Sequence, residues 1–456
     1  MRLKRLGLGV IAGFASFGVD AVVSTLVFPL LLFYLGKAEA GVWMLFSSVG
    51  SMLLTLLNGM APAATRAVAQ MAGRSTTKDF KPEEFGVLRQ SVTMMHLAVS
   101  IIAFLVGVVP LLLYFRSVAL SDHLPFLAIG AGWCGYLVGW LARVWVGRNY
   151  CILDGFGHVG LDRVSRTVSG LLNLGLLMLL LPRGWGVLAP VTAYAVIGIA
   201  LYFVTDWLVR KNVPPVWLQQ PGRHDRAESK KLAIDSGSMI VLGMTSYVVS
   251  QSCVLFVEHS HGAATVATFA PMARVTQLLG AAAMVPNAMI FPYLASAWSA
   301  GDMKRYRKLS WLITCGAPIL YSLPAMVLFM FPGQIFGRWL GAANFVGTSV
   351  ARAFIIYGFV YTVNCSIAMP ALAARHRSFV REAAINFVLV IVLLPLFGAA
   401  FGLIGYPLAM ITGTVVPSAM VLWQSLAFFR STHQRTDPPT LAPDQPATES
   451  ATSISG

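Results

Sequence analysis

Hydrophobic residues in this chain form long runs that follow one another from end to end, with short polar stretches between them. A run of about 20 apolar residues is long enough to cross the ~30 Å hydrocarbon layer of a membrane as a helix. Because unpaired backbone groups are costly in lipid, each run is predicted to be helical. The predicted spans are 8–35, 41–66, 90–115, 124–147, 166–182, 187–209, 233–258, 264–293, 309–331, 349–374, 382–398 and 402–429.

A β-barrel is excluded, because barrel strands alternate apolar and polar residues over roughly 10 positions, whereas here both faces of each run are apolar. The expected fold class is therefore an all-α integral membrane protein of about 12 transmembrane helices. Composition agrees: hydrophobic residues make up 57% of the chain and charged residues only 11%, against about a quarter charged in soluble domains.

The formal net charge of +15 would suggest a nucleic-acid partner in a soluble protein, but here the basic residues are interpreted as topology signals and no nucleic acid is expected. With the N-terminus inside, 27 of the 33 lysines and arginines fall in inner segments. The four in outer segments are Lys37, Arg116, Arg183 and Arg338. This asymmetry predicts a multi-pass protein of the bacterial inner membrane with both termini cytoplasmic.

The chain is expected to divide into two halves. Residues 1–209 and 233–429 would each form a six-helix bundle, joined by a cytoplasmic linker at 210–232 that contains Pro214-Pro215 and Pro221-Gly222. Residues 430–456 are rich in Thr, Ser and Pro and are predicted to be a disordered cytoplasmic tail.

An internal repeat supports this division. Asn173 precedes Pro182 by nine residues in the first half, and Asn386 precedes Pro395 by nine residues in the second. Each pair is followed by a Gly-rich outer turn. Two halves of one orientation imply a pseudo-two-fold axis along the membrane normal and a site between the halves.

Ionisable residues inside the spans are the candidates for function, because burying charge in lipid is costly. Arg274 and Asp20 are the deepest charges. Arg274 is predicted to bind an anion, since guanidinium presents a fork of donors to phosphate oxygens; the alternative is a structural ion pair or a carbonyl contact. Asp20 is predicted to bind a proton or cation coupled to transport, or else to pair with a neighbouring arginine. Arg66 and Arg143 are further candidates for anion binding, with snorkelling to the inner interface as the alternative.

Enzymatic and energy-coupling signatures are missing from the sequence. No GxxxxGK[ST] motif occurs, so the chain is not expected to drive itself with ATP. No HExxH occurs, and the five cysteines form no CxxC pair. The sequence therefore predicts no cofactor, no metal and no enzymatic activity.

Two stretches resemble a known family. Residues 28–44 contain Pro29, Leu35-Gly36 and Gly41-Val42-Trp43, and residues 58–70 contain Arg66. Together with residues 269–280, these stretches resemble the O-antigen and polysaccharide flippases of the multidrug/oligosaccharidyl-lipid/polysaccharide exporter superfamily. The chain departs from that pattern at Asn58-Gly59, where the family often carries Asp and Gly.

The resemblance implies a V-shaped pair of six-helix bundles around a central cavity, as in multidrug and toxic-compound extrusion (MATE) transporters. The implied substrate is an undecaprenyl-pyrophosphate-linked oligosaccharide, which alternating access would move to the periplasmic leaflet for O-antigen or exopolysaccharide biosynthesis. Coupling to H⁺ or Na⁺ and contact with membrane lipids and polysaccharide assembly proteins are implied as well. Arg66, Arg274 and Arg143 would hold the pyrophosphate, and Asp20 the coupling ion.

Two other functions remain open. A MATE-type exporter of drugs or small cations would need an acidic cavity. A membrane-embedded glycan polymerase or glycosyltransferase would usually need a substantial outer loop, and the longest one here is 332–348.

Overall fold

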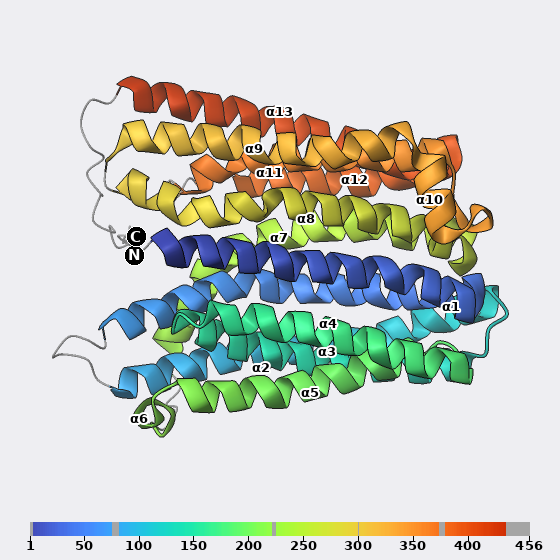
Figure 1. Cartoon of the computed structure of the whole chain (residues 1–456), viewed down its shortest axis with the longest axis horizontal. Helices are drawn as coiled ribbons and strands as arrows, with labels where there is room; N and C mark the ends of the chain where they lie inside the picture. The colour runs from blue at the N-terminus through green and yellow to red at the C-terminus, as the bar shows by residue number, and fades with distance from the viewer. Residues whose placement is uncertain (1–2, 75–81, 221–224, 300, 374–378, 435–456) are drawn as a thin grey trace, which may run out of the picture.

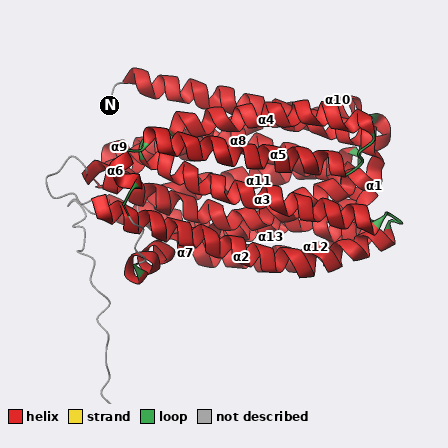
Figure 2. Cartoon of the chain, turned by 90° about the horizontal axis from the view of Figure 1, so that it is seen from below, coloured by secondary structure: helices red, strands yellow, loops and turns green. Residues whose placement is uncertain are grey.

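A computed structural model describes residues 3–74, 82–220, 225–299, 301–373 and 379–434. Its described residues are mostly helical, joined by short loops, and contain no strand (Figure 2). The helices long enough to cross a membrane are α1 (Leu3–Arg74), α2 (Pro82–Ser121), α3 (Phe126–Gly155), α4 (Val159–Leu180), α5 (Leu188–Asn212), α7 (Arg226–His261), α8 (Ala263–Ser299), α9 (Met303–Met330), α11 (Thr348–Ala373), α12 (Phe379–Phe401) and α13 (Gly405–Gln434).

Helix α1 contains the first two predicted spans. It is interrupted at Gly36, whose backbone has φ 76° and ψ 174°, a conformation that only glycine adopts readily. The first part of α1 runs to the right in Figure 1 and the second part returns beside it. With α1 counted as two helices, the described part of the chain has the twelve long helices that the hydrophobic pattern predicts.

By length and composition, eight segments of the described residues could cross a membrane. Two of these segments, Phe17–Leu54 and Arg381–Leu426, each run through two predicted spans. The eight segments thus account for all the predicted spans except the two that lie in α7 and α8. The structure therefore agrees with a multi-pass membrane protein.

The helices lie side by side along the long axis of the molecule (Figure 1). Helices α2 to α5 form one group and α8 to α13 the other, with α1 and α7 between them. The start of α1 and the end of α13 lie at the same end of the molecule, as an even number of crossings requires. We call this the inner end and the opposite one, which carries α10 (Pro332–Leu340), the outer end.

Two segments that were predicted to be connections are helical. The linker contains the short helix α6 (Pro215–Leu218), and α7 begins at Arg226, inside the predicted linker. The outer connection at 332–348 contains α10 and the short 3₁₀ helix η2 (Ala342–Asn344). The predicted tail starts as the last turn of α13, and residues 435–456 lie outside the described residues.

The repeated asparagines lie on helices α4 and α12. A 3₁₀ turn follows each helix, at Leu181–Arg183 (η1) and Gly402–Ile404 (η3). The side-chain oxygens of Asn173 and Asn386 are both buried, and neither has a described hydrogen-bond partner. The two residues share this feature, and superposition of residues 1–209 on 233–429 is the test of the predicted repeat.

Candidate functional site

Hydrogen bonds join the two halves at the outer end. The Tyr114 hydroxyl on α2 donates to the Glu258 carboxylate on α7 at 2.5 Å. The Asp122 carboxylate accepts from the backbone N–H of Ala263, the first residue of α8, at 3.0 Å. A carboxylate in this position satisfies one of the free N–H groups at a helix start and complements its partial positive charge.

Close packing adds to these bonds. A Cβ placed on Gly41 would overlap the carbonyl oxygen of Ala263, so α1 and α8 touch backbone to backbone. Lys37 donates to the carbonyl of Ala343 at 2.9 Å, and the Trp339 indole on α10 donates to that of Thr25 at 3.0 Å. We refer to Gly41, Tyr114, Asp122, Glu258 and Ala263 as the outer seal.

A hydrogen bond is also described at the inner end. It runs from Ser229 on α7, within the linker, to Ser91 on α2 at 3.0 Å. At the outer end, the backbone contact and the two carboxylate bonds of the outer seal hold the two halves directly against each other.

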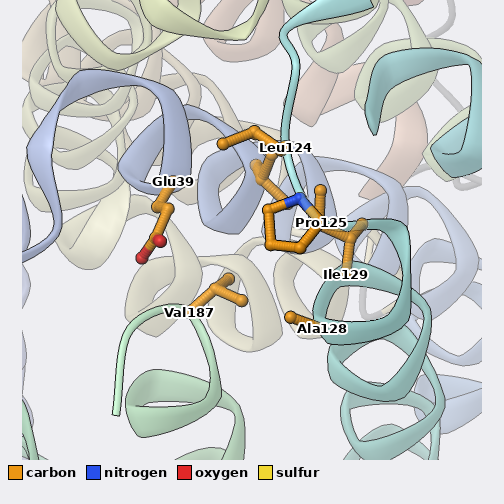
Figure 3. Close-up of a pocket in the computed structure, with 7 residues that line it drawn as sticks. Glu39, Leu124, Pro125, Ala128, Ile129 and Val187 are labelled. Atoms are coloured by element: carbon orange, nitrogen blue, oxygen red, sulfur yellow. The ribbon is translucent and has the colours of Figure 1, made fainter. Parts of the chain in front are cut away.

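A small pocket beside the bend in α1 does not fit a substrate. Its volume is about 10 Å³, and its lining includes Glu39, Pro125 and Val187 (Figure 3). That volume holds about one water molecule. Glu39 lies in the outer turn between the first two predicted spans. It accepts a hydrogen bond from the Val187 backbone, but burial outweighs this bond and raises the pKa of the carboxyl.

Arg143 points into the first bundle. Its guanidinium lies 4.2 Å from the centre of the Tyr194 ring, an arrangement in which the ring face attracts the cation. The Nε atom is buried without a described hydrogen-bond partner. No ion pair of the described residues includes Arg143. The guanidinium therefore lies against the Tyr194 ring within the first bundle, and anion binding by Arg143 stays a prediction.

Aromatic rings extend the Arg143 site toward the outer end. Tyr194 stacks on Tyr136 with ring centres 4.6 Å apart and planes at 4°, and Tyr136 stacks on Trp133 at 5.5 Å. Trp140 anchors the same helix by donating to the Gly50 carbonyl at 2.9 Å. Sequence reasoning missed this cluster, although Trp133, Tyr136, Trp140 and Arg143 are spaced three or four residues apart and so share one helix face.

Arg274 lies on α8 in the second bundle. Its side chain is partly buried. Its described hydrogen bond runs to the Gln277 side chain one turn further on, at 3.5 Å, which is a weak contact. No ion pair of the described residues includes it either. The side chain of Asp20, its proposed partner, lies outside the described residues, although the backbone of Asp20 is part of α1.

Helix register places Arg143 and Arg274 at the same depth. Gly41 on α1 and Ala263 on α8 are level with each other. Two hydrogen bonds, Trp140 to Gly50 and Cys151 to Ala61, fix a constant offset of 90 residues between α1 and α3. At 1.5 Å per residue, Arg143 then lies roughly 18 Å below the Gly41–Ala263 contact and Arg274 roughly 17 Å below it.

Arg66 lies much nearer the inner end. It is exposed and about 37 Å along α1 from Gly41, which is about 21 Å further inward than Arg274. The structure therefore brings Arg143 and Arg274 to one level from opposite halves, and leaves Arg66 on a separate level.

Comparison with solved structures identifies the fold. A mutant form of the MATE transporter VcmN of Vibrio cholerae is similar to this chain with a TM-score of 0.66 at 15% identity, over 94% of this chain and 98% of that one. The chain has the MATE transporter fold. An inward-facing multidrug resistance MATE transporter of the MOP superfamily, the superfamily named above, scores 0.65 at 13% identity, over 91% and 96% of the two chains.

A third neighbour is a MOP superfamily transporter from Pyrococcus furiosus, described as having a binding pocket of reverse polarity that suggests a different function. It scores 0.66 at 12% identity, over 93% of this chain and 96% of that one. The sequence itself matches no family model and no curated protein. At these identities the likeness establishes the twelve-helix fold and leaves the substrate to be argued from the residues.

Proposed function

We propose that this protein is a flippase that moves an undecaprenyl-pyrophosphate-linked oligosaccharide across the inner membrane by alternating access. The observation that carries the proposal is the pair Arg143 and Arg274. They come from opposite halves, lie at one depth, and have no described carboxylate partner. In a membrane, a charge at such a depth marks a substrate or ion pathway unless it is paired.

A pyrophosphate group matches this pair chemically. Guanidinium binds phosphate oxygens through two parallel N–H···O bonds, and it keeps its charge at any pH a cell experiences. Two arginines at one level offer one fork to each phosphate unit. The ring of Tyr194 holds the Arg143 guanidinium in place before the anion arrives, which reduces the entropy lost on binding.

The closed outer side supports loading from the cytoplasmic leaflet. A lipid-linked sugar made on the cytoplasmic side would meet the exposed Arg66 first, near the inner end. It would then move about 21 Å outward to the level of Arg143 and Arg274. Arg66 is thus proposed as an entry residue, and the other two as the central site.

Opening of the outer side then requires the outer seal to break. In an alternating-access cycle, release on the periplasmic side would separate Tyr114 from Glu258 and Asp122 from Ala263. An H⁺ or Na⁺ gradient acting at Asp20 is proposed to supply the energy, and contact with polysaccharide assembly proteins is proposed to deliver and receive the glycan.

Export of drugs or small cations is the second candidate, because neighbours of the same fold are multidrug transporters. A cation substrate is attracted by carboxylates and repelled by arginines. An exporter of this kind should therefore be unaffected or improved when Arg143 and Arg274 lose their charge. The two candidates predict opposite responses to the same substitutions.

The test is complementation of a bacterial strain that lacks its own flippase, with surface polysaccharide and lipid-linked precursor measured together. Arg274→Lys keeps the charge but loses the fork, so export should fall; Arg274→Ala and Arg143→Gln should reduce it further, to below roughly one-tenth. Arg116→Ala removes an exposed arginine at the outer end and is the matched control. Normal export by Arg274→Ala at a normal protein level would refute the phosphate role, whereas loss of the protein itself would indicate a structural ion pair.

A further inference from the structure

A cavity lies at the inner end of the first bundle, away from the central arginines. Its volume is about 520 Å³, and its walls come from α2, α3, α5 and α6. All lining residues belong to the first half or to the linker and none to the second half, so the cavity is no part of the space between the two halves. It is also separate from the proposed transport site, and binding at the cavity does not require that proposed function.

Three arginines and one aspartate line this cavity, which gives it a formal charge of +2. Asp206 is shared: its Oδ2 pairs with Arg210 at 2.7 Å and its Oδ1 lies 3.9 Å from Arg148. Arg89 donates instead to the neutral backbone carbonyls of Leu218 and Gln220, at 2.8 and 3.3 Å. The cavity thus holds one carboxylate against three arginines, and that carboxylate contacts two of them. The side chain of Arg148 is only 18% exposed.

Partly buried cations without enough counter-charge destabilise a protein unless an anion is bound. Arg148 has the amide oxygen of Asn149 as its other acceptor, at 3.0 Å, and a neutral acceptor does not balance the charge. Guanidinium groups that converge on one cavity are suited to phosphate oxygens. The chemistry of the cavity therefore calls for a phosphate-bearing ligand.

The cavity is held in shape by a small hydrophobic core. Trp217 of α6 is buried and lies 5.2 Å from the Phe85 ring and 5.1 Å from the Phe156 ring, measured between ring centres. The aromatic contacts fix α6 against α2 and the end of α3. Arg89 then holds the end of α6 and the residues after it against α2 by its two bonds to backbone carbonyls. The arginines are thus arranged before a ligand binds.

An apolar stripe on α5 leads into the cavity and indicates what the ligand carries besides phosphate. Val196, Ile199, Phe203 and Trp207 are spaced three or four residues apart, and they are 48, 40, 65 and 56% exposed. The next position of the stripe is Arg210, which lines the cavity. Acyl chains of a lipid could lie along this stripe while the headgroup reaches the arginines. Lys211 packs 4.8 Å from the Trp207 ring, which is typical of the membrane interface.

We propose that this cavity binds the headgroup of an anionic glycerophospholipid from the inner leaflet, with its phosphate on Arg89, Arg148 and Arg210 and its acyl chains along α5. Basic pockets between transmembrane helices on the cytoplasmic side are places where such headgroups bind.

Binding of phosphatidylglycerol to the detergent-purified full-length chain, measured by native mass spectrometry, tests this site. We expect saturable binding at least tenfold tighter than that of phosphatidylcholine. Arg148→Gln should weaken it at least tenfold, whereas Arg116→Gln at the outer end should change it less than twofold. Equal affinity for the two lipids, or an unchanged affinity in Arg148→Gln, would overturn the site.

Two further variants keep the test decisive. The side chain of Arg210 is 76% exposed, so Arg210→Gln should fold normally. It should weaken phosphatidylglycerol binding several-fold, and it can be measured even if Arg148→Gln does not fold. Unchanged binding in Arg210→Gln would contradict the site. Phe203→Ser separates a lipid from a soluble phosphate compound. It should weaken phosphatidylglycerol binding and leave the competing effect of inorganic pyrophosphate unchanged. Full competition by pyrophosphate together with no effect of Phe203→Ser would show that the occupant is a soluble phosphate.

Discussion

The outer seal can be tested through Gly41, where α1 and α8 touch without side chains between them. A Cβ at this position would overlap the carbonyl oxygen of Ala263 and would lie 2.5 Å from its carbonyl carbon and 3.2 Å from its Cα. Ordinary contact begins at 3.4 Å, so Gly41→Ala requires the two backbones to part by about 1 Å or more. Neither can yield as a flexible side chain would, because both are main chain in helices.

Overpacking of this kind costs about 1 to 3 kcal/mol. The cost applies only while the outer end is closed, because the two helices separate when it opens. Gly41→Ala should therefore shift the equilibrium toward an outer-open form by roughly 5- to 150-fold. The backbone of Ala263 is also held by Asp122 at 3.0 Å, so α8 cannot slide away without breaking that bond.

The shift is measurable as a distance between spin labels. Labels at Arg116 on α2 and Ser349 on α11 use exposed positions at the outer end of the two halves, in a background without the five native cysteines. Gly41→Ala should add a longer distance to the distribution. Gly316→Ala on α9 has open space around the new Cβ and is the matched control. Identical distributions for Gly41→Ala and the parent chain would refute the claim that this contact closes the outer side.

Three other predictions concern single contacts and the topology. Tyr114→Phe leaves the buried Glu258 carboxylate without its donor, so the unfolding free energy should fall by about 1 to 3 kcal/mol, seen as a lower thermal midpoint; an unchanged midpoint would show that the bond contributes nothing. Burial raises the pKa of the Glu39 carboxyl in the folded state. The protonated carboxyl therefore contributes to stability below the pKa it has in the unfolded chain, and this contribution is lost as the pH rises through its pKa in the folded protein. The parent should lose stability relative to Glu39→Gln over that range, and parallel pH profiles would contradict this. Reporters fused after Lys231 and after Arg430 should both report cytoplasm, and a periplasmic signal at either would overturn the orientation.

The long helices could be predicted from the sequence because lipid imposes one solution on an apolar run of about 20 residues. Shorter helices have to be predicted from the helical spacing of their apolar residues instead of from the length of an apolar run. Helix α10 lies in the outer connection 332–348, which was predicted to be a loop, and its nine residues are too few to cross a membrane. Its apolar positions Ile335, Phe336, Trp339 and Leu340 recur with helical spacing, so periodicity rather than length was the signal to use. In α6, Pro215 opens the helix, a position where proline's missing N–H costs nothing.

The shared depth of Arg143 and Arg274 could not be predicted, because it depends on how far α1, α3 and α8 slide along one another. Those offsets come from tertiary contacts: Gly41 against Ala263, and Trp140 bonded to Gly50. A hydropathy pattern locates a span to within a few residues, and two such errors together shift relative depth by several ångströms. Arg66 and Arg274 were expected to bind the same pyrophosphate group, and helix register places them about 21 Å apart along the axis.

The direction of Arg143, in contrast, could have been derived once the orientation was known. In an α-helix each Cα–Cβ bond tilts toward the helix N-terminus, and long side chains follow it. The charge asymmetry predicts that residues 124–147 run from the outer to the inner side, so an arginine near the inner end of this span leans outward, into the membrane. Snorkelling to the inner interface would oppose that tilt. The Tyr194 ring, only a few residues into α5 from its outer end, lies where the tilt sends the guanidinium. The same argument applies to Arg274, since α8 also begins at the outer end. Orientation and helix geometry together therefore favour a deep position for both charges. The choice between anion binding and a structural ion pair then depends on which groups contact each guanidinium, because both alternatives place it at the same depth.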